Sequence, residues 1–206
     1  MSEHHDHSHA VVTEENSKKL MVALGLTTTF LIVEVVAAFI TQSLALLSDA
    51  AHMFTDVAAL AIALAAIKIG KKAADDKRTF GYQRFEILAA LFNAVMLFVV
   101  AIYIVYEAYQ RFTNPAEIQS VGMMIVAVIG LVINLISMKI LSASAEGSLN
   151  IKGAYLEVLS DALGSIGVII GGIVIYFTQW MWVDTLIAVL IGFWVLPRTW
   201  VLLKQS

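Results

Sequence analysis

Long apolar stretches separated by short polar breaks occupy almost the whole chain. A helix that crosses about 30 Å of hydrocarbon needs about 20 residues, and its backbone groups are then paired internally. Six stretches reach that length, at about 20–41, 44–67, 85–109, 120–142, 153–177 and 182–203. The pattern predicts an all-α membrane protein of six transmembrane helices.

The composition points the same way. The 206 residues are 60% hydrophobic and only 14% charged, whereas an ordinary soluble domain is about 25% charged. There is no cysteine, which excludes disulfides, thiolate metal sites and catalytic thiols. We expect the lipid bilayer as a partner, and neither nucleic acid nor an organic cofactor.

The basic residues predict the orientation. In a six-helix topology, Arg111 lies on one side of the membrane and the other twelve of the 13 basic residues lie on the opposite side. Because cytoplasmic loops carry an excess of Lys and Arg, both termini are predicted to be cytoplasmic, in a multi-pass protein of the inner membrane. Residues 1–17 are acidic and histidine-rich and lack the basic start of a signal peptide, so we interpret them as a cytoplasmic tail.

Ionisable residues inside two of the apolar stretches form a pattern. The second stretch carries Asp49, His52 and Asp56, and the fifth carries Glu157 and Asp161. Spacings of three, four and seven place each set on one helix face. Because the two helices run antiparallel, we expect His52 near the level of Asp161, and Asp56 near Glu157. Charge inside a membrane span is costly and indicates function.

These residue types favour a divalent cation. One imidazole with several carboxylates makes an N/O site suited to zinc, and also to cobalt, cadmium or manganese. Clustered carboxylates repel one another, so either a cation or protons must neutralise them. Metal entry would then expel protons, and proton entry would expel metal. The alternative interpretation is that these buried polar groups only hold helices together.

Other polar residues give weaker signals. Glu34, in the first stretch, is a candidate with Asp49 for a cation or proton pathway. Asp184, at the start of the last stretch, is interpreted as a cap of its own helix N-terminus. Histidines near the N-terminus are an accessory metal-capture site or a weak buffer. They are His4, His5, His7 and His9.

Four segments carry a resemblance to a known family. They are SLALLSDAAHMFTDVAALAIALAA, KRTFGYQRFEILAALFNA, NIKGAYLEVLSDALGSIGVI and WVDTLIAVLIGFWVLPRTW. With them, nearly everything after residue 17 resembles the cation diffusion facilitator family, in its bacterial cobalt–zinc–cadmium efflux branch. The resemblance implies a homodimeric antiporter, not an enzyme, that exports divalent metal from the cytoplasm against protons by alternating access.

The resemblance also implies the transport site. Carried over by position, its metal ligands are His52, Asp56, Glu157 and Asp161. Glu157 stands where many zinc transporters of the family have histidine. We expect this harder, more anionic site to discriminate less between zinc, cadmium and cobalt.

The resemblance leaves the extent of the protein and its function open. Family members usually continue into a cytoplasmic metal-binding domain, whereas this chain stops at Ser206, so we expect either a transport-domain fragment or a naturally tailless member. We therefore expect residues 18–206 to form the transmembrane transport domain alone. The alternative functions are a membrane metal sensor or buffer without transport, a proton-coupled carrier of organic cations, and a passive channel.

Overall fold

A computed structural model describes residues 14–70, 81–114, 116–145 and 149–205. Within them the chain forms six helices and confirms the predicted all-α class. They are α1 (Glu14–Thr41), α2 (Leu44–Gly70), α3 (Gly81–Thr113), α4 (Ser120–Ala145), α5 (Leu149–Thr178) and α6 (Trp182–Gln205). Each of them contains one of the six predicted stretches.

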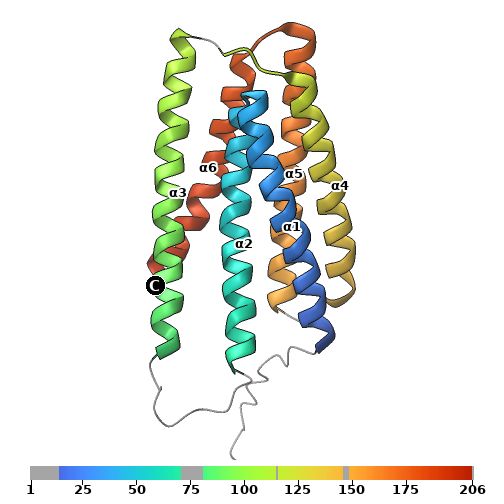
Figure 1. The fold of residues 1–206 in the computed structure, drawn as a ribbon, viewed down its shortest axis with the longest axis vertical. Helices are drawn as coiled ribbons and strands as arrows, with labels where there is room; N and C mark the ends of the chain where they lie inside the picture. The colour runs from blue at the N-terminus through green and yellow to red at the C-terminus, as the bar shows by residue number, and fades with distance from the viewer. Residues whose placement is uncertain (1–13, 71–80, 115, 146–148, 206) are drawn as a thin grey trace, which may run out of the picture.

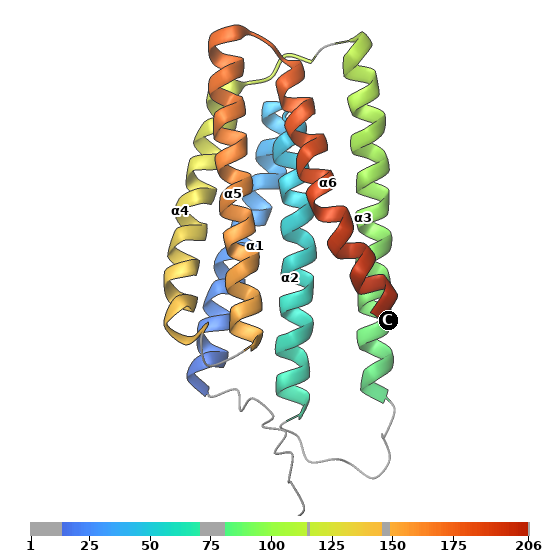
Figure 2. The same cartoon turned by 180° about the vertical axis from the view of Figure 1, so that it is seen from behind.

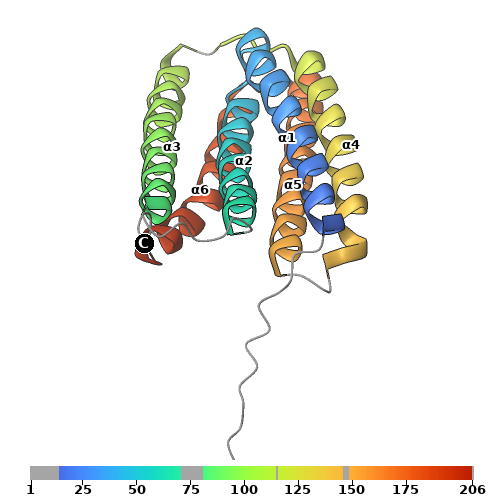
Figure 3. The ribbon, with the colours of Figure 1, turned by 60° about the horizontal axis from the view of Figure 1, so that its bottom comes forward.

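The helices form an upright bundle in which each runs antiparallel to the next (Figure 1). We call the end that holds the α1–α2 and α5–α6 turns the upper end, as Figure 1 draws it. Helices α4 and α5 pack closely together and α1 packs on α4, while α2 contacts α1, α5 and α6 (Figure 2). Helix α3 lies at the side, against α2 and α6 (Figure 3). Helix α2 is therefore central to the bundle.

The surface is strongly apolar. Among the described residues, three helices have the length and composition to cross a membrane, over Lys18–Thr41, Ser120–Ser142 and Ile151–Thr178. Large apolar side chains such as Phe98 and Phe193 are about two-thirds exposed, at 67% and 66%. A soluble monomer rarely exposes so much apolar surface. The protein is therefore a multi-pass membrane protein.

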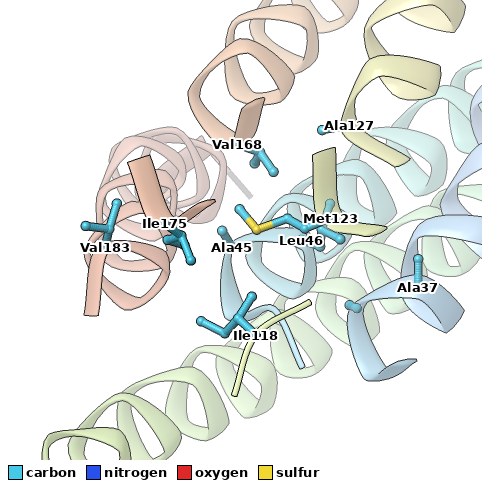
Figure 4. Packing of buried hydrophobic residues seen from close by; sticks show 10 residues of the cluster. Ala37, Ala45, Leu46, Ile118, Met123, Ala127, Val168, Ile175 and Val183 are labelled. Carbon is cyan, nitrogen blue, oxygen red and sulfur yellow. The ribbon is translucent and has the colours of Figure 1, made fainter. Parts of the chain in front are cut away.

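Among the described residues, four apolar clusters fill the bundle, and two of them, which we call the upper core and the lower core, lie on either side of Asp161 along α5. The upper core, centred on Met123, joins α1, α2, α4, α5 and α6 through the side chains drawn in Figure 4. The lower core joins α1, α4 and α5. It consists of Leu20, Ala23, Leu141, Ile151, Ala154 and Val158. Along α5, Asp161 falls between Val158 of the lower core and Val168 of the upper core.

Asp184 fixes the start of α2. It lies in the first turn of α6, as predicted, but its carboxylate caps a different helix. The backbone N–H groups of Leu44 and Ala45 donate to it at 2.7 and 3.2 Å, and the hydroxyl of Ser43 donates at 2.6 Å. A carboxylate in this position satisfies the open N–H groups of α2 and favours its dipole. Asp184 therefore lies in the first turn of its own helix, as expected, but the backbone N–H groups that its carboxylate accepts from belong to α2.

Arg111 completes this anchor from α3. Its guanidinium donates to Asp184 at 3.3 Å and to the backbone oxygen of Gln42 at 2.8 Å. Gln42 adopts a left-handed conformation, with φ of 57°, in the tight turn between α1 and α2. The anchor therefore joins α2, α3 and α6 at the upper end of the bundle.

A glycine on α4 lets α1 approach. The ring of Phe30, 1% exposed, lies against Gly130, and a Cβ atom added there would overlap the ring. Because the ring is buried among packed side chains, it has little room to move.

Gly130→Ala should therefore lower the free energy of unfolding by about 1–3 kcal/mol, the usual cost of overpacking. Gly25→Ala is the matched control, since a Cβ atom there meets nothing within 4 Å. Thermal unfolding in detergent micelles, followed by circular dichroism, compares the two. Equal midpoints for both variants would contradict this packing.

Candidate metal centre

Three buried side chains from two helices converge below the upper core. The Nε2 atom of His52 lies 3.5 Å from Asp56 Oδ2 and 3.6 Å from Asp161 Oδ1. The three residues are 5%, 7% and 1% exposed, and each offers a ligand atom within 4.8 Å of the others. We call them the ligand group. His52 and Asp161 lie at the same level, as the antiparallel arrangement led us to expect.

Helix geometry explains the convergence. His52 and Asp56 are four residues apart, so they lie one above the other on the same face of α2. Asp161 comes from α5, which contacts that face. Two of the three side chains are thus positioned by one helix and the third by packing between helices.

The spacing of the ligand group suits a small cation. Zinc binds histidine nitrogen and carboxylate oxygen at about 2.0–2.1 Å, so tetrahedral ligand atoms lie about 3.3 Å apart. The distances of 3.5 and 3.6 Å around His52 Nε2 are close to that value. Three protein ligands would leave one coordination position for a fourth residue or for water.

Glu157 lies just below the ligand group. It is half-buried and lines a cavity of about 10 Å³ together with Asp56, Asp161 and Thr27. Such a volume is about what one water molecule needs. The remaining walls are apolar and include Val158 of the lower core. Glu157 is therefore near the ligand group, as a neighbour of Asp56 and Asp161, but is not one of its three members.

Two further predicted acids lie above the ligand group. Asp49 is one turn above His52 on α2 and Glu34 is on α1, and they are 2% and 1% exposed. Their carboxyl groups are within hydrogen-bonding reach of each other. They form a pair of their own outside the ligand group. The N-terminal histidines at positions 4, 5, 7 and 9 lie outside the described residues.

Sequence reasoning missed two polar residues on α4. Asn134 and Ser137 are both 0% exposed, and their side chains have no hydrogen-bond partner in the part of the chain that the structure describes. A buried amide without partners is costly. Their presence could have been noticed in the sequence, since an asparagine and a serine stand three residues apart, and so on one face, in an otherwise apolar helix.

The ligand group attracts cations, and it is unfavourable for its carboxylates to remain charged without a bound cation or protons. Two carboxylates and an imidazole are held in an apolar, nearly dry surrounding, where charges interact more strongly than in water. Burying like charges together is unfavourable unless a cation or protons compensate them. The arrangement is therefore suited to binding a divalent ion reversibly in competition with protons.

Comparison with known proteins identifies relatives over nearly the whole chain. Residues 20–206 match the model of the cation efflux transmembrane domain. The chain is 65% identical over 202 residues to the metal cation efflux system protein CzcD of Cupriavidus metallidurans, covering 98% of this chain and 63% of that protein.

Two other relatives are less similar. The cadmium, cobalt and zinc/H(+)-K(+) antiporter of Bacillus subtilis is 42% identical over 193 residues, covering 93% of this chain and 62% of that protein. The zinc transporter ZitB of Escherichia coli is 42% identical over 206 residues, covering 98% and 66%. The chain thus spans a little under two-thirds of the length of these relatives.

Removing a member of the ligand group should weaken zinc binding. Loss of a residue that only supports a metal ligand costs about 10–100-fold in affinity, so His52→Ala and Asp161→Asn should each cost at least about 100-fold. Isothermal titration calorimetry on the detergent-solubilised protein measures this. Glu117→Gln, which changes an exposed acid in the α3–α4 connection, is the control. Parent-like affinity in both ligand variants would refute the ligand group.

Proposed function

The chain belongs to the cation efflux family, and we propose that it is a proton-coupled antiporter that exports divalent cations, namely zinc and also cadmium and cobalt, from the cytoplasm. The observation that carries this proposal is the ligand group, which is buried between two helices and has a spacing suited to a divalent ion. The names of the relatives support the choice of cargo, since they include cation efflux, zinc transport and cadmium–cobalt–zinc antiport.

In this proposal His52, Asp56 and Asp161 bind the cargo directly. Glu157 supplies the fourth ligand, because it shares the small cavity with Asp56 and Asp161. A carboxylate in place of a second imidazole makes the site harder, which favours a wider range of divalent ions. Transport of this kind involves no covalent step.

Competition between metal and protons supplies the coupling. Carboxylate and imidazole bind a metal only when deprotonated, so metal binding releases protons and protonation releases metal. A metal that arrives from the cytoplasm would displace protons there. Once the site is exposed to the other side, protons from outside would displace the metal. The proton gradient then drives export.

The burial of the ligand group favours transport over storage. The upper core on one side and the lower core on the other surround it with apolar side chains, so an ion can enter or leave only if helices move. A sensor or buffer gains nothing from such enclosure, whereas alternating access depends on it. Because α2 and α5 each supply ligands, relative movement of these two helices would open the site.

Location and partners belong to the same proposal. The excess of basic residues on one side supports cytoplasmic termini and placement in the inner membrane. A second copy of the chain is the expected protein partner. The apolar side chains that α3 exposes, such as Phe98 and Val105, are available for lipid or for that copy.

Zinc added to proteoliposomes that contain the parent protein should cause a stoichiometric release of protons. A pH-sensitive dye outside the vesicles reports the protons that leave, and the labelled zinc that accumulates inside reports the zinc that enters. His52→Ala should reduce both at least about tenfold, because the site then loses its only nitrogen ligand. Glu117→Gln should behave as the parent does.

The same vesicles separate the alternatives. A sensor or buffer would bind zinc without counterflow of labelled zinc across the membrane. A passive channel would carry zinc without a matching proton flux. Either result in the parent protein would contradict the proposed antiport.

A further inference from the structure

A pair of acids lies above the ligand group, between α1 and α2. Glu34 is 1% exposed and Asp49 is 2% exposed, and their carboxyl groups lie within hydrogen-bonding reach of each other. Neither belongs to the ligand group, whose ligand atoms lie within 4.8 Å of one another. The proposed metal binding therefore leaves this pair without a role.

The contact between the two groups requires a proton. An ionised carboxylate only accepts hydrogen bonds, so two carboxyl groups can share a hydrogen bond only when one of them is protonated. As carboxylates, neither Glu34 Oε2 nor Asp49 Oδ1 finds a donor among the described residues. One proton between the groups supplies that donor and removes the repulsion of two adjacent negative charges.

The surroundings of the pair offer negative charge. Asp161 on α5 acts electrostatically on Glu34, and Asp56 on α2 acts on Asp49. The titratable group one turn below on α2 is His52. The basic side chains that the structure describes lie closer to a helix end than Glu34 does. They are Lys18, Lys19, Arg111, Lys139 and Lys152.

Helix α5 closes the pair off and leaves little space in it. A Cβ atom added to Gly164 would lie 2.7 Å from Asp49 Oδ1. Because Gly164 has no side chain, the backbone of α5 can lie directly against the Asp49 carboxyl group, which is 2% exposed. Since not even a methyl group fits between Gly164 and Asp49, this position suits a proton better than a metal with its shell of ligands.

We propose that Glu34 and Asp49 together bind one proton, separate from the metal ligands, and that this proton is among those exchanged for metal. The inference rests on the proposed antiport. Helix α2 carries both Asp49 and His52, so a metal bound at the ligand group places positive charge about one turn from the pair. That charge favours release of the shared proton, and proton return favours release of the metal.

The test is the number of protons released per zinc ion bound. Calorimetric titration of zinc into the full chain in nanodiscs, repeated in buffers of different ionisation enthalpy, measures that number directly. Glu34→Gln should release about one proton fewer than the parent. Its zinc affinity should stay within about tenfold of the parent value, because the ligand group is intact. The exposed control Glu117→Gln should match the parent in both.

A second variant tests whether the proton is shared. Asp49→Asn should also release about one proton fewer, and the double variant with Glu34→Gln should lose no more than either single variant. Loss of two protons in the double variant would overturn the pair, because the two acids would then titrate independently. If Glu34→Gln does not fold, the proton count of Asp49→Asn alone tests the proposal.

The glycine contact provides an independent perturbation. Gly164→Ala should displace the Asp49 carboxyl group and lower the proton count as Glu34→Gln does. Gly167→Ala, one turn away on α5, should not, since a Cβ atom there meets nothing within 4 Å. Equal proton counts in the two glycine variants would count against the contact described here.

Two outcomes overturn the proposal while leaving the antiport standing. One is an unchanged proton count in Glu34→Gln. The other is a loss of zinc affinity in Glu34→Gln as large as that of His52→Ala, which would make Glu34 a metal ligand. A parent protein that binds zinc without releasing any protons would instead overturn the antiport itself, together with this inference.

Discussion

The structure depends on one electrostatic constraint, which is that several carboxyl groups are buried together in an apolar bundle. Such groups are stable only when a cation, a hydrogen-bond donor or a proton compensates them. The buried acids Asp184, Asp161 and the pair Glu34 and Asp49 are accommodated in three different ways. Asp184 is compensated by Arg111 and the N-terminus of α2, whereas Asp161 faces an imidazole. Glu34 and Asp49 face each other. From the upper end towards the ligand group, the partner that compensates the negative charge thus changes from a fixed guanidinium to a proton or a cation that can be exchanged.

Different interactions hold the bundle together at its upper end and lower down. At the upper end, Asp184 ties α2 to α3 and α6 through several hydrogen bonds, and the hydroxyl of Ser48 adds another to the backbone of Ala188 at 2.9 Å. The upper core joins α1, α4 and α5 to α2 and α6, whereas the lower core joins only α1, α4 and α5. The ligand group lies between α2 and α5, below the upper core.

Part of this could be predicted from the sequence. The six helices followed from hydropathy, because a membrane-crossing helix has a length fixed by the bilayer. The convergence of His52 with Asp161 followed from helical spacing and antiparallel order. The partner of Asp184 could not be predicted, because a cap on another helix depends on how α6 crosses α2. The Glu34–Asp49 contact and the role of Gly164 likewise depend on packing between three helices, which no local pattern encodes.

The central claim is that His52, Asp56 and Asp161 form the metal site. Anomalous diffraction at the zinc edge, from crystals of the zinc-loaded protein, tests it most directly. We predict the strongest peak within about 2.0–2.2 Å of His52 Nε2 and of one oxygen from each aspartate. A strongest peak elsewhere in the bundle, such as between Glu34 and Asp49, with none at the ligand group, would contradict the account.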